Sequence, residues 1–294
     1  MSSINEYLTS EVVVDYSDGL INRREALHRL SVLGVGLAVA GAMLAACSPA
    51  GTSEPSGPSG TGPAGPSALP TQAITFPGPQ GTLQGAFAAA ADPRGSVLVI
   101  HENRGLTDHI RSVAGRLAAS GYSALAIDLL SEEGGTAKFT DPAEATAALG
   151  AVPPARFIAD LKAGLDELLR RTPAKSLAAM GFCFGGGMVW QLLAAGEPRL
   201  RAAVPFYGPL PDAADLSGSR GAAVLGIYAE LDTRVNATRD AARAALEKAG
   251  LKHEIVTYPG ANHAFFNDTG QRYDPTAATQ AYQRLLDWFG TNLS

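Results

Sequence analysis

The sequence predicts an α/β fold, a mostly parallel sheet with helices on both faces. From about residue 71 onward, short apolar runs alternate with longer amphipathic runs, the pattern of parallel strands connected by helices. Hydrophobic residues make up 46% of the 294-residue chain, enough to bury a sizeable core. A glycine-rich turn near residue 183 joins one apolar run to a helix-compatible run. These features together favour a layered sheet and helices.

The expected elements follow from where these runs begin and end. Strands are expected at Leu83–Ala88, Ser96–His101, Ser123–Asp128, Ser176–Phe182, Ala202–Tyr207, Ala223–Ala229 and His253–Tyr258. Helices are expected at Asp108–Ser120, Ala155–Arg171, Gly185–Ala195, Asn236–Ala249 and Pro275–Phe289. Residues 132–154 and 267–274 are expected to be loops that build the walls of a pocket. Residues 1 to about 20 carry no clear signal.

The N-terminal segment resembles a bacterial export signal. Arg23 and Arg24 precede an uncharged run, Leu30–Ala46, as in twin-arginine signals. The run ends in Leu-Ala-Ala before Cys47, which looks like a lipobox. It is shorter than the ~20 strongly apolar residues of a spanning helix, although an uncleaved membrane anchor is the alternative. We expect residues 1–46 to be a lipoprotein signal, and the chain to be exported and lipid-anchored through Cys47 on the non-cytoplasmic side of the membrane.

The next stretch, residues 47–70, is dominated by Gly, Pro, Ser, Thr and Ala. It cannot bury enough apolar surface to order itself, so we expect a flexible spacer followed by one folded domain over residues 71–294. The net charge of −5 and the lack of a long basic run argue against a nucleic-acid partner. The chain has two cysteines, Cys47 and Cys183, in segments with different roles, so no structural disulfide is expected.

Cys183 lies in the pattern G-x-C-x-G, the cysteine form of a nucleophile elbow. The nucleophile of such a turn has a positive φ, and a Cβ at Gly181 or Gly185 would collide with the adjacent strand or helix. The following helix points its N-terminal N–H groups at the sulfur, which favours a thiolate. The alternative is that Cys183 is a small buried hydrophobic residue. The glycine pattern favours the nucleophile.

A thiol nucleophile needs a base, and the base needs a partner that fixes its tautomer. In the α/β-hydrolase arrangement the order is nucleophile, acid, histidine, each after a strand. Asp232 follows the strand that ends at Ala229, and His263 follows the strand that ends at Tyr258. Glu230 is a rival acid, but it lies so close to the strand end that its side chain is not expected to reach the histidine. A structural role is the alternative for His263.

The other histidines are less well placed for catalysis. His28 lies in the signal segment, His109 on an expected surface helix, and His253 at the start of a strand. His101 alone shares the C-terminal end of a strand, and it precedes the loop that should supply the second oxyanion-hole donor.

The oxyanion hole is expected to be formed by two backbone N–H groups, those of Phe184 and Asn103. Glu102 stands at the same strand end, where a charged carboxylate close to a thiol would oppose its ionisation. The alternative for Glu102 is a surface ion pair with Arg104.

These motifs together resemble the dienelactone hydrolase, or carboxymethylenebutenolidase, family of α/β-hydrolases. The resemblance rests on Gly-Phe-Cys-Phe-Gly-Gly at 181–186, His-Glu-Asn-Arg-Gly at 101–105 and His-Ala-Phe-Phe-Asn-Asp-Thr at 263–269. It implies a triad of Cys183, His263 and Asp232, and a Glu102 that switches the cysteine between a quiet thiol and a thiolate when substrate displaces the carboxylate. It also implies hydrolysis of a small lactone or ester through a thioester, without metal or organic cofactor.

One position departs from the family pattern. Dienelactone-cleaving members resemble each other in an arginine four residues after the catalytic histidine, where this chain has Asn267. Arg272, Arg104 or Arg156 could substitute in binding the substrate. Two alternatives stay open: an exported lipoprotein that binds a ligand without turnover, and a thioesterase or peptidase on the same scaffold.

Overall fold

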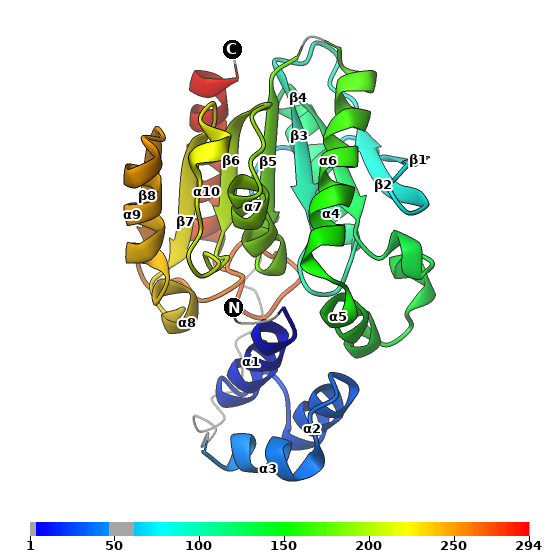
Figure 1. Ribbon diagram of the computed structural model, residues 1–294, viewed down its shortest axis with the longest axis vertical. Coiled ribbons are helices and arrows are strands. Elements are labelled where there is room, and N and C mark those ends of the chain that lie inside the picture. The colour runs from blue at the N-terminus through cyan, green and yellow to red at the C-terminus, as the bar shows by residue number, and fades with distance from the viewer. Residues whose placement is uncertain (1–3, 47–61, 174, 294) are drawn as a thin grey trace.

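The computed structural model describes residues 4–46, 62–173 and 175–293. Its described residues form one sheet of eight strands in the order β1-β2-β4-β3-β5-β6-β7-β8 (Figure 1). The strands are β1 Gln72–Pro77, β2 Thr82–Ala88, β3 Gly95–Ile100, β4 Tyr122–Asp128, β5 Leu177–Phe182, β6 Leu200–Phe206, β7 Ala223–Ala229 and β8 His253–Tyr258. β2 runs antiparallel to β1 and β4, and the remaining pairs are parallel, which confirms the expected α/β-hydrolase fold.

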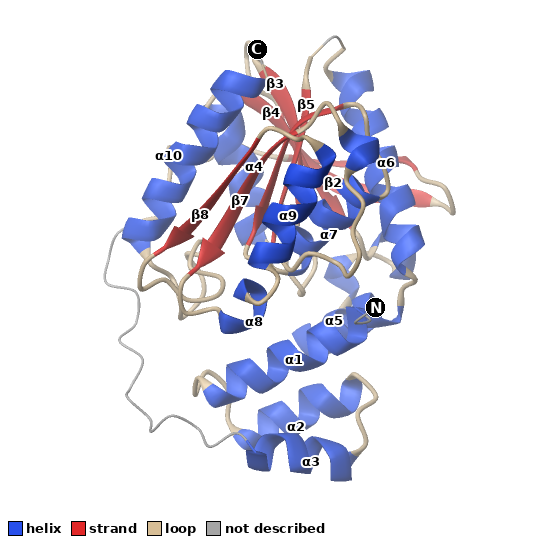
Figure 2. Ribbon diagram, turned by 60° about the vertical axis from the view of Figure 1, so that its left-hand side comes forward, coloured by secondary structure: helices blue, strands red, loops and turns tan. Residues whose placement is uncertain are grey.

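Helices cover both faces of this sheet. They are α4 Asp108–Ala119, α6 Pro154–Arg171, α7 Phe184–Ala194, α9 Arg239–Ala249 and α10 Pro275–Asn292. Figure 2 shows α10 on one side of the sheet and α7 and α9 on the other. Every residue of β3, β4, β5 and β7 is buried, as expected for strands covered on both faces. Because β5, β6, β7 and β8 run parallel, the carboxyl ends of β5, β7 and β8 lie at one edge of the sheet.

Three elements differ from the expectation. β1 was not predicted, because it is an edge strand with alternating exposure and ends in proline. The expected helix over 236–249 is two helices, α8 Thr233–Asn236 and α9, separated by Ala237 and Thr238. The expected loop over 132–154 contains the helix α5 Pro142–Ala151, which begins with an Asp141 N-cap.

The N-terminal residues form three further helices, α1 Ile4–Ser17, α2 Arg23–Val32 and α3 Leu37–Ala46. They lie together at the edge of the sheet where the parallel strands end (Figures 1 and 2). Leu8 and Leu30 are fully buried, so these helices share a packed core. Arg23 and Arg24 open α2, and Cys47 lies outside the described residues. Among the described residues, no helix combines the length and apolar character needed to cross a bilayer.

The ordered part of the domain begins earlier than residue 71. Tyr273 donates a hydrogen bond to the Gly62 carbonyl, Arg116 donates one to the Ala64 carbonyl at 2.6 Å, and the Leu69 N–H donates to Gly115. The expected spacer over 47–70 is therefore wrong for its last residues, 62–70. Their composition offers little apolar surface, but side chains and backbone of the domain hydrogen-bond to their backbone groups, and this needs no apolar run. Residues 47–61 lie outside the described chain.

Candidate active site

Cys183 occupies the sharp turn between β5 and α7, and its backbone has φ 57°. A Cβ on Gly181 would lie 2.3 Å from the Gly185 carbonyl oxygen, and one on Gly185 would lie 2.4 Å from the Ile100 oxygen. Both distances are far below van der Waals contact, so only glycine fits at either position. The turn therefore has the backbone that the G-x-C-x-G pattern predicts.

The expected acid and base lie at the ends of the neighbouring strands. His263 Nδ1 is 2.5 Å from Asp232 Oδ2, and both side chains are buried. The other Asp232 oxygen accepts the Val235 N–H. Glu230 accepts the Gly260 N–H instead, so it does not bind the histidine. Because Nδ1 is engaged by the carboxylate, Nε2 is the ring nitrogen left for a substrate or nucleophile.

A residue that the sequence did not indicate lies between the thiol and the imidazole. Cys183 Sγ donates to Glu11 Oε2 at 3.5 Å, and Glu11 Oε1 is 3.5 Å from His263 Nε2. The sulfur, a ring nitrogen of His263 and a Glu11 oxygen all lie within 4.8 Å of one another. Tyr7 Oη is 3.4 Å from the same sulfur, and Glu11 also forms an ion pair with Arg234.

Cys, His and Glu side chains are zinc ligands, so these three residues could in principle hold a metal ion. They are the one such group among the described residues. The Arg234 guanidinium, already ion-paired with Glu11, places a positive charge beside the cluster and disfavours a cation there.

The thiol of Cys183 is held in its neutral form. Its pKa is raised to about 12, chiefly by burial and then by the negative charge of Glu102, while hydrogen bonds from Tyr7 and the Phe184 N–H act in the opposite direction. The expected stabilisation of a thiolate by the helix N-terminus is thus present, but desolvation outweighs it. The sequence could not show this, because two residues that contact the sulfur, Tyr7 and Glu11, come from α1.

Glu102 is not paired with Arg104. Its Oε2 accepts a hydrogen bond of 2.6 Å from Asn267, and its Oε1 is buried without a hydrogen-bond partner among the described residues. Asn103 lies on the wall of the cavity beside Cys183, and its carbonyl accepts a hydrogen bond from Thr146. The unpaired Glu102 oxygen leaves this carboxylate with capacity for another donor.

The three candidate arginines differ in how far they are already engaged. Arg156 pairs with Glu133 and lies 3.6 Å from Asp160, so it is part of a separate ion cluster. Arg272 binds Asp15 and Asp18 of the N-terminal segment, and it is not the solvated loop residue that was one alternative. Arg104 is exposed, and no side-chain partner is found for it among the described residues.

Two other histidines have structural roles. His101 is fully buried, with Nδ1 2.6 Å from the Glu102 carbonyl oxygen and Nε2 accepting the Leu129 N–H, and burial lowers its pKa. His109 was expected on a surface helix, which is wrong: it is buried and binds Asp268 at 2.6 Å. The amphipathic pattern of α4 placed the helix correctly, but position 109 falls on its inner face.

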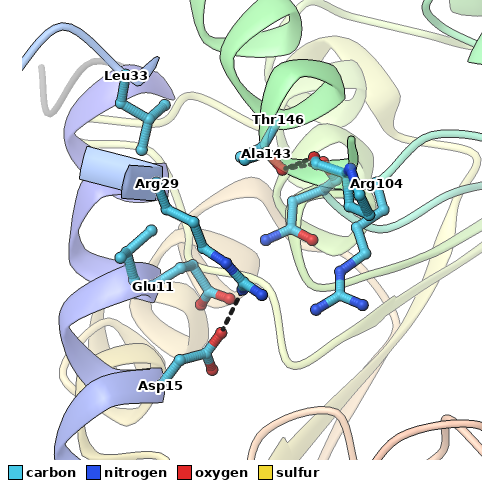
Figure 3. Close-up of a pocket in the computed structure, with 10 residues that line it drawn as sticks. Glu11, Asp15, Arg29, Leu33, Arg104, Ala143 and Thr146 are labelled. Carbon is cyan, nitrogen blue, oxygen red and sulfur yellow. Dashed lines mark hydrogen bonds and ion pairs between the residues drawn. The ribbon is translucent and has the colours of Figure 1, made fainter. Parts of the chain in front are cut away.

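A cavity of about 510 Å³ opens beside Cys183 and His263, and it is lined by both the domain and the N-terminal helices. Figure 3 shows a smaller pocket next to it, with Glu11, Asp15 and Arg29 on one side and Arg104 on the other. Tyr7 and Glu11 are the site residues that the sequence did not reveal. The one signal in the sequence concerns Glu11: acidic residues at 11 and 15 are spaced to lie on one helical face.

The profile of the Dienelactone hydrolase family matches residues 83–293. The chain is 37% identical over 205 residues to the Salmonella typhi protein named "Putative carboxymethylenebutenolidase", covering 66% of this chain and 76% of that one. The chain belongs to the dienelactone hydrolase family. Members of this family hydrolyse lactones or esters, and this chain is a hydrolase of that type.

Solved structures of dienelactone hydrolase type have the same fold. One from Klebsiella pneumoniae, titled "Putative Dienelactone Hydrolase", has 32% identity and a TM-score of 0.67, covering 75% of this chain and 98% of its own. A dienelactone hydrolase-like promiscuous phosphotriesterase from metagenomic libraries has 27% identity and a TM-score of 0.68, covering 77% of this chain and all of its own. The shared region is the sheet domain.

Proposed function

We propose that this protein hydrolyses small lactones or carboxylic esters through a Cys183–His263–Asp232 triad and a thioester acyl-enzyme. The observation that carries the proposal is the placement of Cys183 on a positive-φ elbow, within 4.8 Å of an imidazole that Asp232 binds at 2.5 Å. Nucleophile, base and orienting acid thus stand in the order of a catalytic triad.

In the first half of the reaction, His263 Nε2 takes the proton of the Cys183 thiol while the sulfur attacks the substrate carbonyl carbon. The carbonyl oxygen becomes negative and accepts the N–H groups of Phe184 and Asn103. The C–O bond to the leaving alcohol then breaks, and His263 returns the proton to the alcohol oxygen. A thioester on Cys183 remains.

In the second half, water attacks the thioester carbonyl and gives a proton to His263. The tetrahedral intermediate collapses, the C–S bond breaks, and the sulfur takes the proton from His263 as the acid leaves. For a lactone, alcohol and acid are two ends of one product. Asp232 keeps Nδ1 protonated throughout and stabilises the imidazolium.

Glu102 has a positioning role in this scheme. Its charge raises the pKa of the Cys183 thiol and so helps to keep the thiol protonated and unreactive in the free enzyme. We assign the switch to displacement of this carboxylate from the sulfur when substrate enters; in the structure described here the Asn267 amide already donates to Oε2 at 2.6 Å and orients the carboxylate.

The test compares turnover of a p-nitrophenyl ester and a small lactone. Cys183→Ala should abolish turnover and leave thermal unfolding unchanged. Asp232→Asn should lower kcat by about a thousandfold or more, because the amide favours the wrong histidine tautomer. Glu230→Gln, the matched control, should retain activity because Glu230 binds the Gly260 N–H. Undiminished turnover in the Cys183 variant would remove the thiol from the mechanism.

A second candidate is a binding protein that holds a ligand without turnover. It is favoured by the raised pKa of Cys183, about 12, since an inert thiol suits a binder. A burst of p-nitrophenol matching one acyl group per chain, with a mass increase on the Cys183 peptide, would exclude it. A thioesterase or peptidase would be recognised by preference for those acyl groups in the same screen.

We also propose that residues 1–46 are a twin-arginine lipoprotein signal and that Cys47 is lipidated after export. Support comes from Arg23-Arg24, the uncharged run and the Leu-Ala-Ala-Cys sequence. Radiolabelled palmitate should enter the wild-type chain and be lost in Cys47→Ser, with Cys183→Ser as the control that keeps the label. Equal labelling of wild type and the Cys47 variant would contradict the proposal.

A further inference from the structure

We propose that helix α1 is an intramolecular inhibitor that holds the active site closed while the N-terminal segment is attached, and that loss of the segment opens it. The proposal rests on the proposed function of Cys183, and it adds a state in which that function is withheld. It concerns residues 4–17, which lie beyond the ends of the parallel strands (Figure 1) and contribute Glu11 and Asp15 to the lining of the cavity beside Cys183.

Glu11 occupies the place where the reaction would occur. One carboxylate oxygen accepts the thiol hydrogen bond of Cys183 and the other lies 3.5 Å from His263 Nε2. A substrate carbonyl must reach the same sulfur, and the thiol proton must reach the same nitrogen. The carboxylate of Glu11 thus stands where the acid product of an ester would stand, and it resembles a bound product.

Other contacts of the Cys183 sulfur also hinder access of a substrate. Tyr7, one turn before Glu11, places its hydroxyl 3.4 Å from Cys183 Sγ. The thiol is 3% exposed and Glu11 6%. Burial is the largest cause of the raised thiol pKa, and α1 supplies part of that burial. Removal of the helix would hydrate the sulfur and lower the pKa toward the ordinary value.

Complementary charges hold α1 in this position. Arg234, from the short helix α8 after β7, forms an ion pair with Glu11 and lies over the Tyr7 ring at 4.4 Å. Arg272 binds Asp15 at 2.9 Å and Asp18 at 2.6 Å, and its side chain is only 10% exposed. The acidic face of α1 is therefore matched by arginines of the domain at two separate points.

The rest of α1 is anchored by apolar packing. Leu8 is fully buried and Val12 nearly so, and both belong to the core shared with the other N-terminal helices and the domain. A helix of this length is marginal in water by itself, so its order depends on this docking. Cleavage before Cys47 would separate α1, α2 and α3 from the domain covalently, and the site would open as they leave.

A competing interpretation is that α1 is a permanent wall of the substrate cavity, because Glu11 and Asp15 also line the 510 Å³ cavity. The two interpretations predict opposite changes in turnover. Disturbing an inhibitor increases turnover and thiol reactivity, whereas disturbing a needed wall decreases turnover.

The experiment uses the full chain with Cys47→Ser, so that Cys183 is its one thiol. Glu11→Gln removes the charge, and Glu11→Arg adds repulsion toward Arg234. Glu247→Arg, on the exposed face of α9, is the matched control for the charge change. Two quantities are measured at pH 8: the rate of Cys183 alkylation by iodoacetamide, and turnover of a p-nitrophenyl ester.

We expect alkylation to accelerate by at least about tenfold in Glu11→Arg, less in Glu11→Gln, and not at all in Glu247→Arg. Turnover should rise in the same order. Faster alkylation without turnover in any chain would sink the hydrolase function and leave the inhibitor in place. Unchanged alkylation, or turnover that falls in both Glu11 variants, would overturn the inhibitor.

A second arm covers a variant that fails to fold. A protease site placed within residues 47–61 of the full chain allows the segment to be cut after folding and removed on a column. Alkylation and turnover should rise on removal, and the uncut chain carried through the same steps is the control. A cut chain that reacts no faster than the uncut one would overturn the proposal.

Discussion

At the scale of single residues, the state of Cys183 is decided by what surrounds the sulfur more than by the turn that carries it. The elbow and the α7 N-terminus favour ionisation, but burial and Glu102 oppose it and raise the thiol pKa to about 12. Hydration of the site would lower the pKa of this thiol and so make it more reactive. The chemistry of this cysteine therefore reports on the position of α1.

The pH dependence of Cys183 alkylation follows from this pKa. A thiol is reactive only as the thiolate, and a raised pKa keeps it protonated, so at pH 8 the thiolate is about one part in ten thousand. In the full chain carrying Cys47→Ser, the iodoacetamide rate should keep rising about tenfold per pH unit between pH 7.5 and 9.5. A plateau near pH 8.5, the ordinary cysteine value, would contradict it. Unfolded chain, measured in urea, is the control that should show that plateau.

At the scale of elements, the junction of β5 and α7 is fixed by close contacts between backbones. The glycines on either side of Cys183 approach carbonyl groups of β3 and of the turn itself. The α7 helix begins directly at Phe184, so the elbow and the first turn of the helix form one unit. A substitution at these glycines would therefore displace the nucleophile and also destabilise the fold.

Alanine substitutions in α7 should separate these effects. In Gly185→Ala the new Cβ would lie 2.4 Å from the Ile100 oxygen and 2.5 Å from the His101 oxygen, so we expect a loss of about 3 kcal/mol or more in unfolding free energy. In Gly187→Ala the nearest atom, Pro209 Cδ, is 3.6 Å away, and a gain of up to about 1 kcal/mol is expected from helix propensity. Urea unfolding measures both. Equal unfolding free energies of the two variants would contradict the inference that close backbone contacts exclude a Cβ at Gly185.

The sheet, the turn at Cys183 and the contact between His263 and Asp232 were predictable because their signals are local. Apolar runs marked seven of the strands, G-x-C-x-G predicted the turn, and the places of Asp232 and His263 after successive strands predicted that these two side chains meet. β1 and α5 were missed because an edge strand and a short Ala-rich helix leave weak patterns. Glu11 was missed for another reason: its contacts to Cys183 join positions 172 residues apart, and no local pattern records them.

At the scale of the whole molecule, the N-terminal helices and the sheet domain are joined by charge pairs across the active-site edge. Arg234 and Arg272 belong to the domain, and their acidic partners belong to the N-terminal segment. Arg29 of α2 adds a contact to Asp15 from within the segment. Docking of the segment is thus sensitive to single charges of the domain.

Arg272→Gln should loosen this docking. Loss of the guanidinium removes the domain's ion pairs with Asp15 and Asp18, so amide hydrogen exchange in α1 should become faster, while exchange in β5 stays unchanged. Arg284→Gln, which removes an ion pair with Glu254 within the domain, is the control and should leave α1 unaffected. Exchange in α1 that is the same in both variants would show that the Arg272 ion pairs do not hold the helix.

The position of α1 at the start of the chain has a consequence for biosynthesis. A ribosome makes residues 4–17 well before β5, β7 and β8, so this segment is already available to dock when the elbow, the acid and the imidazole first assemble. A newly made chain can therefore shield its thiol as soon as the sheet closes. Under the proposed cleavage before Cys47, cellular esters and electrophiles would meet a protected sulfur until residues 1–46 are removed.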